Sequence, residues 1–110
     1  MHARPSDIRP PARGDLPAIV DLLNVIDVAE IGRPDSSPED LESDWDAAGF
    51  DLARDARLAT GPAGEPAGYA YAGDQFRTGE LEGDVFVHPE GGEPGLARRL
   101  LDLVDRKSVV

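Results

Sequence analysis

The apolar positions of the chain first follow helical spacing. They fall at Leu16, Ile19, Val20, Leu23 and Ile26. Polar residues occupy the positions between them, as in a helix with one face against a core. Asp15 stands where an N-cap is expected, and Gly32, followed by Pro34, stands where the helix ends. The pattern therefore predicts a helix from residue 16 to about residue 31.

Two shorter signals flank this helix. The stretch "IRPPA" before it (residues 8–12) predicts a brief strand, because Pro10 and Pro11 cannot donate to a sheet and end it early. After it, Ser37 has the character of an N-cap, Pro38 occupies the first helical position, and Asp40 stands three residues after the cap. A second helix is therefore expected from residue 38 to near Gly49.

The apolar spacing then changes to that of strands. The later part of residues 50–60 and the stretch "AGYAYAG" (residues 67–73) each predict a strand, joined by the turn "GPAGEP". Tyr69 and Tyr71 should share one face of the second of these strands. The stretch "ELEGDVFVHP" (residues 80–89) predicts a third strand. One face of it should carry Leu81, Gly83, Val85 and Val87.

Helical spacing returns after a Pro and Gly cluster. A final helix should start near Gly95 and bury one stripe of its surface. The stripe consists of Leu96, Leu100, Leu103 and Val104. The predicted order is a short strand, two helices, a three-stranded antiparallel meander and a helix, which is an α+β fold. We expect residues 1–7 to form a flexible tail and residues 8–110 to form one domain.

Composition and charge exclude several classes of function. With 40% hydrophobic and 30% charged residues, the 110-residue chain has an ordinary globular composition. A net charge of −11 argues against binding to nucleic acid or anionic membranes. There is no cysteine, so disulfides and thiolate metal sites are excluded, and we find no metal-ligand spacing. The sequence shows neither a signal peptide nor a run long enough to span a membrane, so a cytoplasmic protein is expected.

The strand-to-helix turn "VFVHPEGGEPGLARRLL" (residues 85–101) is the main candidate site. A glycine-rich turn leading into a helix often holds phosphate, because unpaired N–H groups and the helix dipole both favour an anion. The P-loop motif does not fit, since no lysine lies near the glycines. The dinucleotide motif does not fit either, since Pro94 stands two residues after Gly92. A plain corner of the chain remains the alternative.

The same stretch resembles the acetyl-CoA motif of GCN5-related N-acetyltransferases. The resemblance is carried by "V-x-V-x-P" at the strand end, then a short loop, then a small-residue helix start, and by the order of the preceding elements. It implies that the strand pairs by its backbone with the pantetheine arm, through Val85, Phe86 and Val87. It also implies that the loop and helix start surround the pyrophosphate. Those residues are Glu93, Pro94, Gly95, Leu96, Ala97 and Arg98.

The loop departs from the family pattern at three positions. Gly92 stands where the family has Gln or Arg, Pro94 lacks an N–H donor, and Glu93 adds negative charge beside the expected anion. The family fold also continues beyond the final helix. The resemblance therefore implies a chain that covers only the N-terminal portion of the domain. Either the rest of the domain is missing, or another chain completes the sheet. The strand over residues 81–87 should then be an open edge, which favours a homodimer.

Carboxylates and aromatic residues supply the remaining candidates. Glu82 is either the general base, acting directly or through water on an ammonium acceptor, or a carboxylate that simply faces solvent. The acidic residues between Asp35 and Asp51 either border a cationic acceptor or form a solvated helix face. Trp45 either packs in the core or closes over a ligand, and the tyrosines either pack or line the acceptor site. His88 is interpreted as a loop residue.

Two functions therefore stay open. One is an acetyl-CoA-dependent N-acetyltransferase that acetylates a primary amine, on a small molecule or on a protein. Its mechanism is direct attack of the amine on the thioester, with the backbone N–H near Val87 polarising the carbonyl oxygen. The other is a non-catalytic acidic interaction or regulatory module of the same fold.

Overall fold

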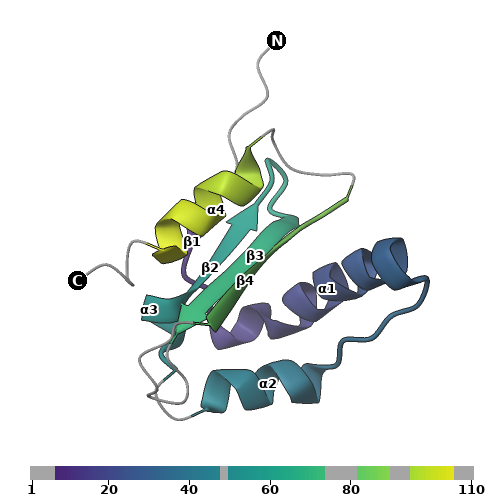
Figure 1. Cartoon of the computed structure of the whole chain (residues 1–110), viewed down its shortest axis with the longest axis horizontal. Coiled ribbons are helices and arrows are strands. Elements are labelled where there is room, and N and C mark those ends of the chain that lie inside the picture. Colours follow the sequence, from purple (N-terminus) through teal and green to yellow (C-terminus); the bar gives the residue numbers. More distant parts are fainter. Residues whose placement is uncertain (1–6, 48–49, 74–81, 90–94, 106–110) are drawn as a thin grey trace.

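A computed structural model of the chain describes residues 7–47, 50–73, 82–89 and 95–105. Its elements are β1 (Asp7–Arg9), a 3-10 turn (Arg13–Asp15), α1 (Leu16–Ile31), α2 (Pro38–Asp46), α3 (Leu52–Asp55), β2 (Ala56–Thr60), β3 (Pro66–Gly73), β4 (Glu82–Val87) and α4 (Leu96–Asp105). The strands form an antiparallel sheet in the order β1-β2-β3-β4. Helices α1 and α2 lie on one face of the sheet and α4 lies on the other (Figure 1). The predicted α+β meander is confirmed.

The ends of several elements follow the chemistry of their residues. Strand β1 stops at Arg9, directly before Pro10, as expected. Gly32 ends α1 in the left-handed conformation, with φ 81°, and its N–H donates to the carbonyl oxygen of Val28 at 3.0 Å. Ser37 caps α2 by accepting the N–H of Asp40 at 3.2 Å.

Two local expectations were wrong, and one short helix was not expected. Asp7, expected in the tail, pairs with Thr60 as the first residue of β1. Asp15 does not cap α1, because its carboxylate accepts the Ala12 N–H at 2.7 Å and the Arg9 guanidinium at 2.8 and 3.0 Å instead. The hydrogen bond from Arg9 holds the pKa of Asp15 below its usual range. The extra helix α3 forms because the Asp51 carboxylate accepts two of its first amides.

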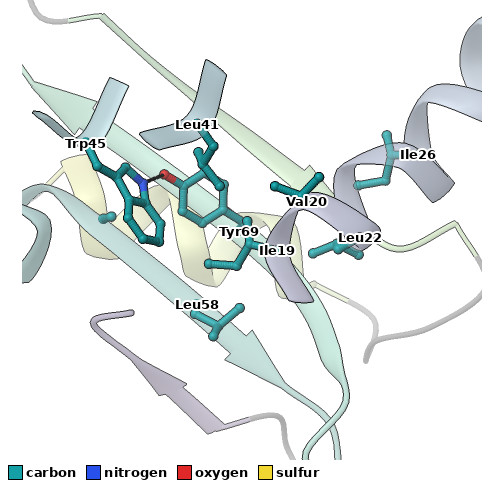
Figure 2. Close-up of a cluster of buried hydrophobic side chains, with 9 residues drawn as sticks. Ile19, Val20, Leu22, Ile26, Leu41, Trp45, Leu58 and Tyr69 are labelled. Carbon is teal, nitrogen blue, oxygen red and sulfur yellow. Dashed lines mark hydrogen bonds between the residues drawn. The ribbon is translucent and has the colours of Figure 1, made fainter. Parts of the chain in front are cut away.

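The larger core lies between the sheet and helices α1 and α2 (Figure 2). Its helical contribution comes mainly from Ile19, Val20, Leu22 and Ile26. Leu22 is buried more fully than the predicted Leu23, which packs against the edge of the cluster. The core also contains a hydrogen-bonded pair of side chains.

That pair consists of Trp45 and Tyr69, which are each 2% exposed. The indole Nε1–H of Trp45 donates to the Tyr69 hydroxyl oxygen at 3.0 Å (Figure 2). A buried indole needs such a partner, because an unsatisfied N–H costs about 1–3 kcal/mol. Trp45 is therefore a core residue and ties α2 to β3.

Burial of Tyr69 makes the stability of the fold depend on pH in the alkaline range. Desolvation raises the pKa of Tyr69 to about 12 from its ordinary 10.0. The unfolded chain loses this proton first, so stability is intact below pH 10 and falls as the pH rises toward 12, by up to about 1.4 kcal/mol per pH unit. This loss of stability is measured by urea unfolding at successive pH values, followed by Trp45 fluorescence.

The matched variant is Tyr69→Phe. Loss of the hydroxyl leaves the Trp45 N–H without its acceptor, so the baseline stability falls by about 1–3 kcal/mol. The dependence on pH across this window should nevertheless disappear, because the titrating group has gone. A pH dependence that persists in the variant would contradict the assignment to Tyr69.

A second, smaller core lies between the sheet and α4. Leu96, Leu100 and Val104 are at most 3% exposed and pack on small sheet residues, whereas the predicted Leu103 is only half-buried. The approach is close at Gly68, where an added Cβ would lie 2.7 Å from Cδ1 of Leu100. The absence of a side chain at Gly68 therefore sets the height of α4 above β3.

Candidate functional site

Strand β4 forms one edge of the sheet, and the candidate site lies beside this edge. The His88 N–H donates to the Ala67 carbonyl oxygen at 2.9 Å, and the register pairs Phe86 with Tyr69 and Val87 with Gly68. Backbone groups of an antiparallel strand alternate between its two sides. The amides of Phe86 and His88 therefore face β3, and those of Val85 and Val87 face the open edge.

One of the two outward amides has a partner in its own strand. The Val85 N–H donates to Oδ1 of Asp84 at 2.9 Å. Sequence reasoning missed this contact of Asp84. The available signal was an Asp directly before an outward-facing amide of an edge strand, since Asp side chains readily accept nearby backbone N–H groups. At Val87 the amide faces outward without such a neighbour in the sequence.

The side chains of β4 alternate between the two cores. Val85 and Val87 pack toward the core under α4, and Phe86 packs toward the core under α1 and α2. The rings of Phe86 and Tyr69 stack with centroids 6.4 Å apart, and Tyr71 lies 6.1 Å from Tyr69. Tyr71 and Phe86 are half-buried. Phe86 thus contributes its ring to the site, while its own amide is directed at β3.

The start of α4 supplies the second half of the site. Gly95 adopts φ 83°, a left-handed conformation that favours glycine, and its carbonyl accepts the Arg99 N–H at 3.0 Å. The first amides of a helix, here those of Leu96, Ala97 and Arg98, have no acceptor within the helix. A Cβ added at Gly95 would meet none of the described atoms within 4 Å. Within the described residues, Gly95 is therefore not crowded by any neighbour.

The side chains at the helix start differ in exposure. Leu96 is buried under the helix, whereas Ala97 and Arg98 are exposed. Arg98 Nε lies 3.6 Å from Oδ1 of Asp102, and its side chain is 80% exposed. An exposed pair of this kind contributes at most about 1 kcal/mol, so Arg98 can turn toward an anion at modest cost. Glu93 and Pro94 lie outside the described residues.

Glu82 stands at the opposite end of β4 from Val87. Its backbone pairs with Gly73 of β3. Five residues of extended strand separate the α-carbons of Glu82 and Val87 by about 17 Å. A carboxylate at Glu82 and the amide of Val87 therefore do not share one hydrogen-bonded reaction centre without water or movement between them.

The acidic stretch maps largely onto the outer surface of α2. Glu39, Asp40, Glu42, Asp44 and Asp46 are exposed, and Leu41 and Trp45 form the buried side of the helix. Partial burial and the neighbouring Asp40 raise the pKa of Asp44. These carboxylates form a solvated face, as one of the two interpretations expected. His88 follows β4 and is half-buried.

Neither a metal centre nor a membrane span emerges from the described parts of the chain. No group of three or more His, Asp or Glu residues there has the geometry to hold a metal ion. Within the same residues, no helix has the length and apolar content needed to cross a bilayer. The open strand edge and the helix start are therefore the features that bear on function.

Comparison with solved structures identifies the fold. A GCN5-related N-acetyltransferase from Sphaerobacter thermophilus matches with a TM-score of 0.81 and 32% identity, over 94% of this chain and 32% of that chain. A GNAT superfamily phosphinothricin acetyltransferase from Sinorhizobium meliloti, in complex with AcCoA, matches with a TM-score of 0.68 and 20% identity, over 94% and 60% of the two chains. A GNAT acetyltransferase from Staphylococcus aureus Mu50 matches with a TM-score of 0.72 and 15% identity, over 94% and 65%.

No protein-family model and no curated protein matches the sequence. The structural matches show that the chain has the fold of an N-acetyltransferase. It has the GCN5-related N-acetyltransferase (GNAT) fold and spans less than two thirds of the length of each compared chain. That partial coverage fits the expectation of an N-terminal portion of the domain.

The contact between Asp84 and Val85 leads to a prediction about the open edge. Asp84→Ala frees the Val85 amide and removes a charge that discourages strand addition. Self-association should strengthen about five- to tenfold, the equivalent of about one hydrogen bond. Light scattering over a concentration series measures it. Asp35→Ala removes the same charge away from β4 and should have no effect, and equal gains in both variants would contradict a role for the edge.

Proposed function

We propose that the chain is part of an acetyl-CoA-dependent N-acetyltransferase that acetylates a primary amine. The observation that carries the proposal is the joint exposure of the β4 edge and the amide-rich start of α4. The AcCoA complex of the Sinorhizobium enzyme supports it by analogy. A cytoplasmic location is part of the same proposal.

The residues present fit such a ligand. The start of α4 offers a diphosphate amides that have no acceptor within the helix and a positive helix dipole, and no described atom would meet a Cβ at Gly95. Strand β4 offers the backbone of Val85 and Val87 to an extended pantetheine arm, in the manner of an added strand. The Val85 amide must leave Asp84 to take part.

Bound acetyl-CoA would supply an acetyl thioester: attack of the neutral amine on its carbonyl carbon would form the amide bond, break the C–S bond and release CoA, whose sulfur takes up the remaining amine proton. The part of the chain is to hold the thioester and to polarise it. The outward N–H of Val87 would donate to the carbonyl oxygen, on which negative charge develops. Glu82 is the proposed acceptor of the proton that the ammonium group loses first, through water, because it stands at the opposite end of β4 from Val87. The acceptor then lies toward the half-buried Tyr71 and Phe86.

Calorimetry with acetyl-CoA tests the proposal. The expected result is a dissociation constant in the micromolar range, together with weakening in high salt because the contact is partly electrostatic. Arg98→Gln should weaken binding severalfold, and Arg57→Gln, on β2 at a distance from the helix start, serves as its control. Absence of binding up to millimolar acetyl-CoA would instead favour the non-catalytic acidic module. The exposed carboxylates of α2 are the observation that supports that alternative.

We also propose that another strand pairs with β4, from a second copy or from a different chain. The support is the position of β4 at the sheet edge and its outward-facing amides. Light scattering of the purified chain tests this. A dimer whose mass is independent of dilution would support it, and a monomer at all concentrations would count against self-pairing.

A further inference from the structure

A cavity lies between α1 and the end of the sheet at which His88 follows β4. Its volume is about 280 Å³. The wall formed by α1 consists of Ala18, Leu22 and Val25 together with one carboxylate. Pro66 from the start of β3 completes the apolar lining. The volume is close to the lower end of the range for small-molecule sites, which begins near about 300 Å³.

The polar groups of the cavity are mostly acidic. Asp21 lies on α1, Glu65 ends the β2–β3 turn, and His88 follows β4. Glu65 is held in place because its Oε2 accepts the Ala63 N–H at 3.0 Å. Among the described residues, no Arg or Lys forms an ion pair with Asp21 or Glu65. The two negative charges are therefore not neutralised by any described cation.

We propose that this cavity binds a small primary or secondary alkylammonium ion. The apolar wall from α1 and Pro66 covers a short alkyl chain, and the carboxylates of Asp21 and Glu65 attract the ammonium group. The net charge of −11 raises the local concentration of cations further. A metal ion fits less well, since the described residues contain no cluster of three metal-ligating side chains.

The cavity is a different place from the expected general base, since His88 is six residues along the strand from Glu82, which corresponds to about 20 Å. His88 directly follows Val87, so the cavity lies at the same end of β4 as the proposed polarising amide. The inference does not depend on acetyl transfer, because its test measures binding in the absence of acetyl-CoA. Failure of acetyl-CoA binding and failure of alkylammonium binding are separate results.

The experiment is an amide NMR titration of the whole chain with butylammonium. Butan-1-ol and butanoate serve as probes of the same shape with no charge and with the opposite charge. We expect saturable shifts at the amides of Ala18, Leu22 and Val25, with a dissociation constant in the millimolar range, as is usual for so few non-hydrogen atoms. Binding of butan-1-ol should be at least about tenfold weaker.

Two matched variants locate the charge effect. Asp21→Asn and Asp35→Asn each remove one negative charge, but Asp35 lies in the segment between α1 and α2 and is not part of the cavity wall. We expect about tenfold weaker butylammonium binding in Asp21→Asn and no change in Asp35→Asn. Thermal unfolding of both variants confirms that they fold.

Any of three results would overturn the inference. One is equal affinity for butylammonium and butan-1-ol, and another is shifts that do not saturate or that lie outside the cavity. The third is equal weakening in the Asp21 and Asp35 variants, which would assign the effect to the overall charge. A cavity-filling variant, Ala18→Leu, adds a check, since binding that survives it at unchanged affinity also excludes this site.

Discussion

Replacing Val87 by proline should slow the proposed acetyl transfer about 100-fold or more, because it removes the outward amide that the proposed mechanism directs at the thioester oxygen. The strand should tolerate the change. Proline is accepted on an edge strand where its missing N–H faces away from the neighbour, and Phe86 before it is already extended. Release of CoA with an amine that the unaltered chain acetylates is the measurement, and acetyl-CoA binding is followed in parallel.

Val87→Thr is the matched control, because it keeps both the branched side chain and the amide. It should retain activity within a few-fold of the unaltered chain. If the proline variant folds and transfers acetyl at the original rate, the polarising donor is not the Val87 amide. A donor nearer Glu82 would then be required, which is also the end of β4 where the expected base stands.

Leu100→Ala should lower the free energy of unfolding by about 2–5 kcal/mol. Leu100 is fully buried on α4, and its Cδ1 lies against Gly68, so the truncated side chain leaves a cavity at the contact that seats the helix. Loss of this contact should also weaken acetyl-CoA binding, because the amides at the start of α4 are held by the same packing. Urea denaturation measures the first effect and calorimetry the second.

The neighbouring Leu101 provides the control. It is 46% exposed on the same helix, so Leu101→Ala should change stability by no more than about 0.5 kcal/mol. Equal destabilisation by both variants would contradict the placement of α4. A stable Leu100→Ala chain that still binds acetyl-CoA would show that the helix start does not depend on this contact.

Much of the fold was predictable because its signals are local. Ser37 and Gly32 act through contacts within a few residues, and the Pro10–Pro11 pair ends β1 by removing donors. Helical and strand periodicity placed α1, β3, β4 and α4 for the same reason. Asp15 was misjudged because its carboxylate has a choice of partners, and the choice depends on Arg9, which only the path of β1 brings near.

The candidate site, too, could be predicted from the sequence only in part. The turn at Gly95 and the strand before it were visible in the sequence, since glycine and alternating valines mark them. Which amides of β4 face outward was not, because it depends on the pairing register with β3. The cavity beside α1 also escaped the sequence, as it joins Asp21 to Glu65 and His88, which are distant in the chain.

The pairing of Trp45 with Tyr69 has a practical consequence for every binding experiment above. The sequence holds a single tryptophan, and its indole is fixed against a tyrosine whose ring stacks on Phe86 of the edge strand. The chain thus carries one tryptophan fluorophore, two aromatic contacts away from where the proposed ligand would lie. Excitation selective for tryptophan separates its emission from that of the two tyrosines, so the unlabelled protein can report occupancy of that strand.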